Sequence, residues 1–193
     1  MKRKHPLNFN PNYLTISRFV LTLPLPFIFS LGKTWATTFT VLLIIGIGLT
    51  DFLDGWIARH YGQISDKGEL IDSMADGFAR STIFILFTSI GLVPAWMVII
   101  CLWRDVIAWT IKGLFLIQKG QLLRKRLTGK IMGVTHSFTI AIIMVTGFML
   151  KMDGLNNDAK TITFYAMLAA TVASSISIFD LMITHKHIIR YLF

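Results

Sequence analysis

Apolar residues along the chain gather into long stretches that are separated by short polar segments. Six stretches approach or exceed the roughly 20 residues that a helix needs to cross a bilayer. They are Tyr13–Leu31, Trp35–Ala58, Glu69–Leu92, Pro94–Gln118, Lys130–Leu150 and Thr161–Thr184. We therefore predict an all-α integral membrane protein with six transmembrane helices, folded as a single domain over 1–193. Pro24 and Pro26 should kink the first helix, because proline cannot donate a backbone hydrogen bond.

The composition favours a membrane protein over a soluble domain. Hydrophobic residues make up 54% of the chain, charged residues 15%, and the mean hydropathy is +0.64. The single cysteine, Cys101, excludes an intrachain disulfide and should be a small buried residue. The basic residues Lys2, Arg3 and Lys4, followed by an apolar stretch, resemble a signal peptide. No A-x-A cleavage site follows and Arg18 interrupts the stretch, so we expect the first helix to be retained.

Basic residues are distributed unevenly between alternate loops. Twelve lie in the N-terminal segment 1–12, the second loop, the fourth loop and the C-terminal end: Lys2, Arg3, Lys4, Arg59, Lys67, Lys119, Arg124, Lys125, Arg126, Lys130, Lys186 and Arg190. The other loops hold only Lys33, Lys151 and Lys160. We therefore expect both termini and a polar cavity to face the cytoplasm, in the inner membrane of a prokaryote. The net charge of +9 then reflects topology and attraction to anionic lipid, and no nucleic-acid partner is expected.

One run of spaced acidic and small residues stands where the second and third predicted helices meet. It reads D-x2-D-G-x2-A-R-x8-G-x3-D-x3-D and consists of Asp51, Asp54, Gly55, Ala58, Arg59, Gly68, Asp72 and Asp76. At about 100° per residue, the first five share an arc of roughly 140° and the last three an arc of roughly 80°. We expect the two acidic pairs to face each other across a helical hairpin of antiparallel neighbours.

Four carboxylates without a neighbouring Cys or His offer only hard oxygen ligands, which suit Mg²⁺ or Mn²⁺ better than Zn²⁺ or copper. Two such ions would largely neutralise the acids, and the small residues among them leave space for a nucleotide diphosphate. The alternative is a set of ordinary ion pairs at a solvated helix end, formed with Arg59, Lys67 and Arg80. For Arg80, an i,i+4 pair that holds Asp76 is the favoured interpretation.

The complete pattern resembles the signature of the CDP-alcohol phosphatidyltransferases, integral membrane enzymes of phospholipid synthesis. The resemblance implies that an acceptor hydroxyl attacks a CDP-linked lipid, typically CDP-diacylglycerol, and that CMP is released. It implies that two Mg²⁺ or Mn²⁺ ions are held by Asp51, Asp54, Asp72 and Asp76, and that Asp76 is also the general base. The CDP moiety is then expected to contact Gly55, Ala58, Arg59 and Gly68. We also expect a homodimer.

Residues outside the motif extend the resemblance. Asn12, Thr15 and Arg18 resemble an N-x-x-T-x-x-R stretch that opens the first span in many relatives. Asn12 and Thr15 either contact the nucleotide or cap that helix, and Arg18 either joins the site or snorkels to the interface. Inside the fourth span, Arg104 and Asp105 are expected to face the bundle interior or a wet cavity, with an internal Arg–Asp pair as the alternative.

The acceptor depends on residues outside the shared motif. Arg104 and Lys130 match the R-[DE] and G-K positions of glycerol-phosphate-using relatives, and a phosphorylated acceptor needs such cations. We therefore expect sn-glycerol 3-phosphate, as in the phosphatidylglycerophosphate synthase branch. Ser73 and Gly77 stand where that branch commonly has Pro and Lys, which keeps inositol or inositol phosphate as an alternative. Cardiolipin synthesis of the CMP-releasing kind is another.

Two further interpretations do not involve an enzyme. A divalent-cation transporter could use the acids as a pathway, and a catalytically inactive scaffold could retain the fold alone. Transporters place ion sites near the bilayer midplane within repeats, whereas these acids are predicted at the cytoplasmic end. Of the remaining polar residues in the spans, His136 is expected to be a satisfied interior histidine, and Asp180 could line the cavity.

Overall fold

The computed structural model of the protein describes residues 12–61, 66–123, 126–153 and 157–185. For 12–14, 51–61, 67, 148–153 and 157 it describes the backbone alone. The described residues form helices and no strand, which confirms the all-α prediction. The helices are α1 (Asn12–Thr22), α2 (Leu25–Ser30), α3 (Thr34–Tyr61), α4 (Asp66–Ser89), α5 (Ala95–Lys119), α6 (Leu127–Asp153) and α7 (Asn157–Thr184).

The first predicted span is divided into two helices. α1 ends at Thr22 and α2 begins at Leu25, because Pro24 has no N–H to continue the hydrogen-bond ladder. The predicted kink is therefore confirmed. The chain turns with little loss of bonding, since Leu23 N donates to Phe19 O (3.1 Å) and Ile28 N donates to Pro24 O (2.9 Å).

Apolar length varies among the helices. In the described residues, the stretches Leu127–Gly147 and Asp158–Thr184 are long and apolar enough to cross a membrane, and the apolar parts of the N-terminal helices, Thr15–Ser30 and Thr34–Thr50, are shorter. α4 and α5 carry charged side chains along their length, including Asp76, Arg80, Arg104 and Asp105. By length and composition, two of the helices in the described part of the chain could cross a membrane.

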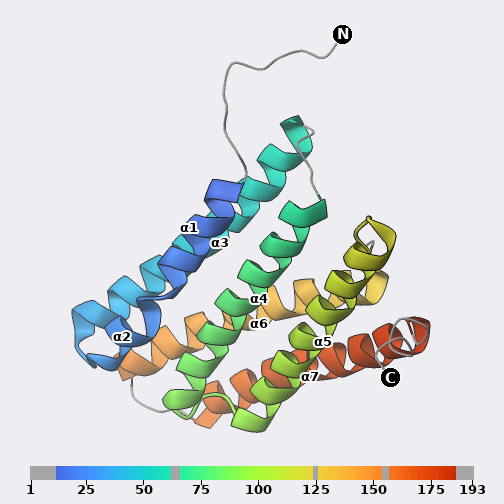
Figure 1. The fold of residues 1–193 in the computed structure, drawn as a ribbon. Coiled ribbons are helices and arrows are strands. Elements are labelled where there is room, and N and C mark those ends of the chain that lie inside the picture. Colours follow the sequence, from blue (N-terminus) through green and yellow to red (C-terminus); the bar gives the residue numbers. More distant parts are fainter. Residues whose placement is uncertain (1–11, 62–65, 124–125, 154–156, 186–193) are drawn as a thin grey trace.

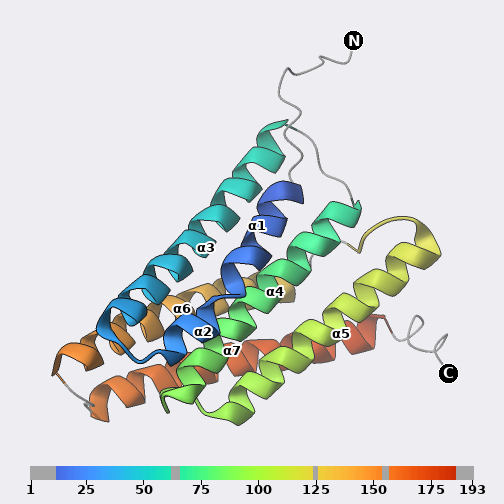
Figure 2. The ribbon, with the colours of Figure 1, turned by 60° about the vertical axis from the view of Figure 1, so that its left-hand side comes forward.

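The order of the helices in space differs from their order along the chain. α6 and α7 form the most extensive pair, α5 packs against α7 and α4, and α1 packs against both α4 and α3. Figure 2 shows α1 lying between α3 and α4, which touch each other little. The expectation that the two acidic pairs face each other concerns side chains at 51–61, which lie outside the described part of the chain. The N-terminus of α1, the C-terminal end of α3 and the start of α4 lie at the same end of the molecule (Figure 1).

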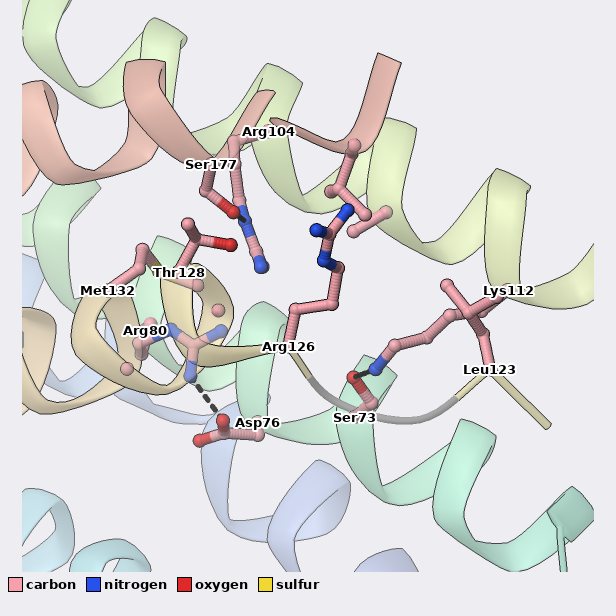
Figure 3. A pocket seen from close by; sticks show the side chains of 14 residues that line it. Ser73, Asp76, Arg80, Arg104, Lys112, Leu123, Arg126, Thr128, Met132 and Ser177 are labelled. Atoms are coloured by element: carbon pink, nitrogen blue, oxygen red, sulfur yellow. Dashed lines mark hydrogen bonds and ion pairs between the residues drawn. The ribbon is translucent and has the colours of Figure 1, made fainter. Parts of the chain in front are cut away.

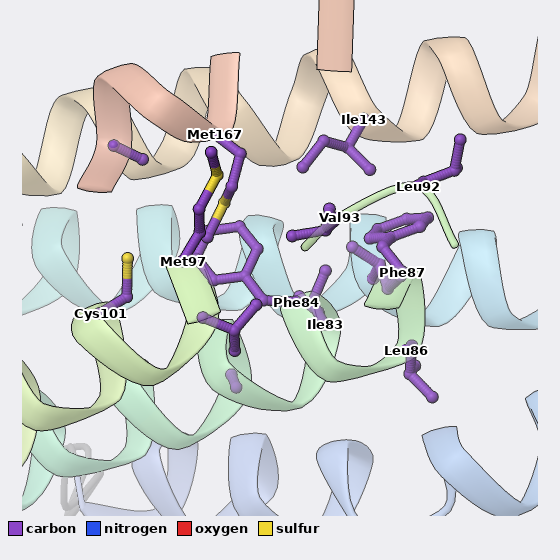
Figure 4. Packing of buried hydrophobic residues seen from close by; sticks show 14 of the residues in the cluster. Ile83, Phe84, Leu86, Phe87, Leu92, Val93, Met97, Cys101, Ile143 and Met167 are labelled. Atoms are coloured by element: carbon purple, nitrogen blue, oxygen red, sulfur yellow. The ribbon is translucent and has the colours of Figure 1, made fainter. Parts of the chain in front are cut away.

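The core is built mainly by α4, α5, α6 and α7, with Leu25 of α2 and Ile44 and Ile47 of α3 added to it. Figure 4 shows Phe84, Met97, Ile143 and Met167 converging from the four main helices, and each is at most 1% exposed. The outer faces are also apolar: Trp103, Phe138 and Phe179 are 62%, 67% and 65% exposed. Such large exposed apolar side chains are unfavourable in water and compatible with lipid. The packing thus agrees with a protein of the membrane.

Candidate active site

The acids of the second half of the motif lie on one face of α4. Asp72 and Asp76 are one helical turn apart and both are partly exposed. Arg18 donates from Nη1 to Oδ1 of Asp72 (3.1 Å), and Arg80 donates from Nη1 to Oδ2 of Asp76. The i,i+4 pair predicted for Arg80 is therefore confirmed. Each of these carboxylates is paired with a guanidinium group.

Arg18 reaches the motif from the neighbouring helix. Its side chain is 0% exposed, so it does not snorkel to the interface, and its bond to Asp72 ties α1 to α4. Thr15, one turn earlier, is 6% exposed and lies within α1 rather than at its N-cap. The buried polar face of α1 therefore lies against α4.

The first half of the motif lies on the last turns of α3. Asp51, Asp54, Gly55, Ala58 and Arg59 are helical in backbone, as predicted, and their side chains lie outside the described part of the chain. Gly68 lies in the first turn of α4 and Asn12 at the start of α1. Within the described residues no group of three or more His, Cys, Asp or Glu could hold a metal. The donor set that the full motif would provide is four carboxylates from two helices, and its chemistry suits Mg²⁺ or Mn²⁺.

A cationic pocket opens beside Asp76, between α4, α5, α6 and α7. Its cavity volume is about 50 Å³, within about 560 Å³ of space that includes open solvent. Figure 3 shows four cationic side chains around it, Arg80, Arg104, Lys112 and Arg126. Hydroxyl groups from Ser73, Thr128 and Ser177 complete the polar lining. The convergent guanidinium and ammonium groups suit a phosphate group.

Arg104 both lines the pocket and forms the internal pair with Asp105, the two alternatives that the sequence left open. It donates from Nη1 to Oδ1 of Asp105 (2.8 Å), which is the internal pair, and it also lines the pocket. Its Nε donates to Ser177 Oγ on α7 (3.2 Å). The predicted cavity residue on α5 is therefore held between two partners, one on its own helix and one on the facing helix.

Lys130 is not brought into the pocket. Its side chain is exposed, and the pocket is lined instead by its neighbours on α6, Thr128, Gly129, Met132 and Gly133. The reason is helical phase. At about 100° per residue, Lys130 points roughly 130° away from the middle of that lining face.

Two other cations take the place expected for Lys130. Lys112 donates from Nζ to Ser73 Oγ (2.9 Å), which brings it to the α4 face between Asp72 and Asp76. Arg126 pairs with Oδ1 of Asp180 (3.1 Å), and Thr128 donates to the same carboxylate (2.6 Å). Lys112 could have been expected in the pocket from its spacing. It follows Arg104 by eight residues, which places both side chains on one face of a helix.

The remaining interior polar residues lie away from the pocket lining. His136 is 1% exposed, shares a hydrogen bond between Nε2 and Ser174 Oγ (2.9 Å), and meets the Phe84 ring edge-on at 5.6 Å. The prediction that it is an interior histidine is confirmed. Cys101 is 3% exposed, as expected for a small buried residue.

The fold and the site together define an all-helical protein with large exposed apolar faces, in which two arginine-paired carboxylates adjoin a cationic pocket. Comparison with known proteins narrows this class. The model of the CDP-alcohol phosphatidyltransferase family matches residues 8–176, and the chain belongs to that family.

Several curated relatives are similar to parts of the chain. A CDP-diacylglycerol–glycerol-3-phosphate 3-phosphatidyltransferase of Cereibacter sphaeroides is 27% identical over 160 residues, covering 81% of this chain and 72% of that protein. Its counterpart in Rickettsia typhi is 36% identical over 66 residues, covering 34% and 37%. A probable cardiolipin synthase (CMP-forming) of Drosophila melanogaster is 37% identical over 97 residues, covering 50% of this chain. The matched region spans only 29% of the fly protein.

Proposed function

We propose that this protein transfers a phosphatidyl group from CDP-diacylglycerol to a hydroxyl group of sn-glycerol 3-phosphate. The acceptor oxygen bonds to the lipid-side phosphorus, the bond from that phosphorus to the bridging oxygen breaks, and CMP leaves. The observation that carries the proposal is the cationic pocket beside Asp76, lined by Arg80, Arg104, Lys112 and Arg126. Three guanidinium groups and an ammonium suit a phosphate far better than the uncharged ring of inositol.

The chain's own residues supply positioning and proton transfer in this proposal. The pocket cations hold the acceptor phosphate so that its free hydroxyl lies toward Asp76. Asp76 accepts the proton of that hydroxyl, and the hydrogen bond from Arg80 orients its carboxylate. The CDP moiety is assigned to the other motif positions and the start of α1: Asn12, Thr15, Gly55, Ala58, Arg59 and Gly68.

The proposal includes two divalent cations, Mg²⁺ or Mn²⁺, which would be held by Asp51, Asp54, Asp72 and Asp76. When bound, they would neutralise the pyrophosphate and stabilise the leaving CMP. Support comes from the chemistry of the donors, which are carboxylate oxygens alone.

The same proposal places the protein in a prokaryotic inner membrane, crossing it six times, with α1 and α2 forming one crossing together. Both termini and the pocket would face the cytoplasm, where glycerol 3-phosphate enters and CMP leaves. Support comes from the basic residues concentrated in alternate loops. We further propose a homodimer, as the family resemblance implies.

Phosphatidylglycerol is a second candidate acceptor, because of the similarity to the fly relative. The fly relative is named a probable cardiolipin synthase (CMP-forming), and a phosphatidylglycerol acceptor also carries a phosphate that the pocket could bind. The deciding assay measures CMP release by purified protein from CDP-diacylglycerol with Mg²⁺ or Mn²⁺. Glycerol 3-phosphate, inositol, inositol phosphate and phosphatidylglycerol are supplied in competition. Incorporation of any acceptor other than glycerol 3-phosphate as the principal product would refute the first choice, and no CMP release with any of them would refute the reaction.

A further inference from the structure

A buried carboxylate lies behind the cationic pocket, at a position that the proposed reaction does not use. Asp105 on α5 is 2% exposed. An ionised carboxylate among packed apolar helices is costly unless its oxygens are paired. Here each oxygen faces one arginine. Oδ1 accepts from Nη1 of Arg104 (2.8 Å), and Oδ2 accepts from Nη2 of Arg80 (3.4 Å).

The two arginines extend from Asp105 toward different parts of the site. Arg80 uses its other terminal nitrogen, Nη1, to bind Asp76, the proposed base. Arg104 uses Nε to bind Ser177 (3.2 Å), and its side chain lines the pocket. A guanidinium is a rigid planar fork, so fixing one nitrogen fixes where the others point. The bonds form a continuous chain from Asp76 through Arg80, Asp105 and Arg104 to Ser177.

We infer that Asp105 is a positioning residue that orients Arg80 toward the metal-site acid Asp76 and Arg104 toward the acceptor phosphate. The inference rests on the proposed function, because it concerns binding of Mn²⁺ and of glycerol 3-phosphate at that site. Asp105 itself touches neither Mn²⁺ nor glycerol 3-phosphate. It aligns the two arginines, Arg80 and Arg104, that lie beside these ligands. The positive charge of Arg80 is balanced by two carboxylates, those of Asp76 and Asp105.

A positioning role and a simple charge role predict opposite results for the acceptor. Asp105→Asn keeps the size of the side chain and removes its charge. If Asp105 only tuned the charge of the pocket, its neutralisation would leave more positive charge and tighten binding of a phosphate. If Asp105 positions Arg104, the loss of its charged hydrogen bond misaligns the guanidinium, and binding weakens despite the added positive charge.

The experiment measures binding to the purified full-length protein without CDP-diacylglycerol. Mn²⁺ is followed by electron paramagnetic resonance and glycerol 3-phosphate by calorimetry. In Asp105→Asn we expect the dissociation constants of both ligands to rise about tenfold. Asp158→Asn is the matched control, because it removes the same charge from an exposed position at the start of α7, and it should change neither constant.

The outcomes separate the alternatives. Tighter or unchanged binding of glycerol 3-phosphate in Asp105→Asn overturns the inference. Should that variant not fold, Ser177→Ala decides, because it removes the other partner of Arg104 and leaves Asp105 in place. We expect Ser177→Ala to raise the dissociation constant of glycerol 3-phosphate by about threefold or less, and a rise as large as tenfold would assign the positioning to Ser177 instead. Wild-type protein that binds both ligands but releases no CMP would refute the proposed reaction and leave this test intact.

Discussion

Gly77 occupies the closest approach between α4 and α5, one residue after Asp76. A Cβ added at this position would collide with Cζ2 of Trp109 and lie 3.1 Å from both Cε2 and Cη2 of the same ring. The indole has little freedom to move, because it stacks on Phe78 with ring centroids 5.0 Å apart and donates from Nε1 to the carbonyl of Ser73 (3.2 Å). Gly77→Ala must therefore push α5 away from α4 or break these contacts.

The expected magnitude is the difference between two terms. Overpacking of a rigid contact costs about 1–3 kcal/mol, whereas replacing a helical glycine by alanine gains about 1 kcal/mol. Gly46→Ala on α3 is the matched control, because a Cβ there meets nothing within 4 Å and only the gain applies. We expect the free energy of unfolding of Gly77→Ala to lie about 1–3 kcal/mol below that of Gly46→Ala. Denaturant titration in mixed micelles measures both.

The clash should also affect the acceptor site. Lys112 lies one turn after Trp109 and donates to Ser73 Oγ (2.9 Å), so a shift of α5 carries this cation away from the pocket. We expect Gly77→Ala to raise the KM for glycerol 3-phosphate more than the KM for CDP-diacylglycerol. In a Trp109→Ala background the destabilising effect of Gly77→Ala should disappear. Equal unfolding free energies for Gly77→Ala and Gly46→Ala, or an undiminished effect without the indole, would refute the reasoning.

Three further predictions concern the metal site, the acceptor and the topology. Asp72→Asn should abolish Mg²⁺- or Mn²⁺-dependent CMP release by folded protein, and retention of more than about a tenth of the activity would argue against a ligand role. Arg104→Ala should raise the KM for glycerol 3-phosphate with little change in the KM for CDP-diacylglycerol; an unchanged acceptor KM would remove Arg104 from the acceptor site. A membrane-impermeant thiol reagent applied outside intact cells should label Asp158→Cys and not Asp66→Cys, and the reverse result would place the motif on the wrong side.

The sequence predicted the helices well, because helix formation depends on local spacing. The apolar periodicity placed the helices within a few residues, and proline chemistry placed the break after α1. The i,i+4 pair between Arg80 and Asp76 follows from helix geometry alone. The order of packing could not be predicted in this way. The contact of α1 with α4 includes the part-buried ion pair between Arg18 and Asp72, which joins residues 54 positions apart and which no local pattern encodes.

Local spacing in the sequence did not predict correctly which cations line the acceptor pocket. Lys130 was selected by its place in a G-K pair, yet its phase on α6 turns it outward, while Arg126 is drawn inward by Asp180 on α7. Lys112 belongs to the pocket because Ser73 holds it, and Ser73 is one of the two positions where the chain departs from glycerol-phosphate-using relatives. The other is Gly77, where the space that a side chain would fill is taken by Trp109. The two positions are linked in this structure: the absence of a side chain at Gly77 lets α5 approach α4, and that approach brings Lys112 to Ser73 and supplies the pocket with a cation from α5.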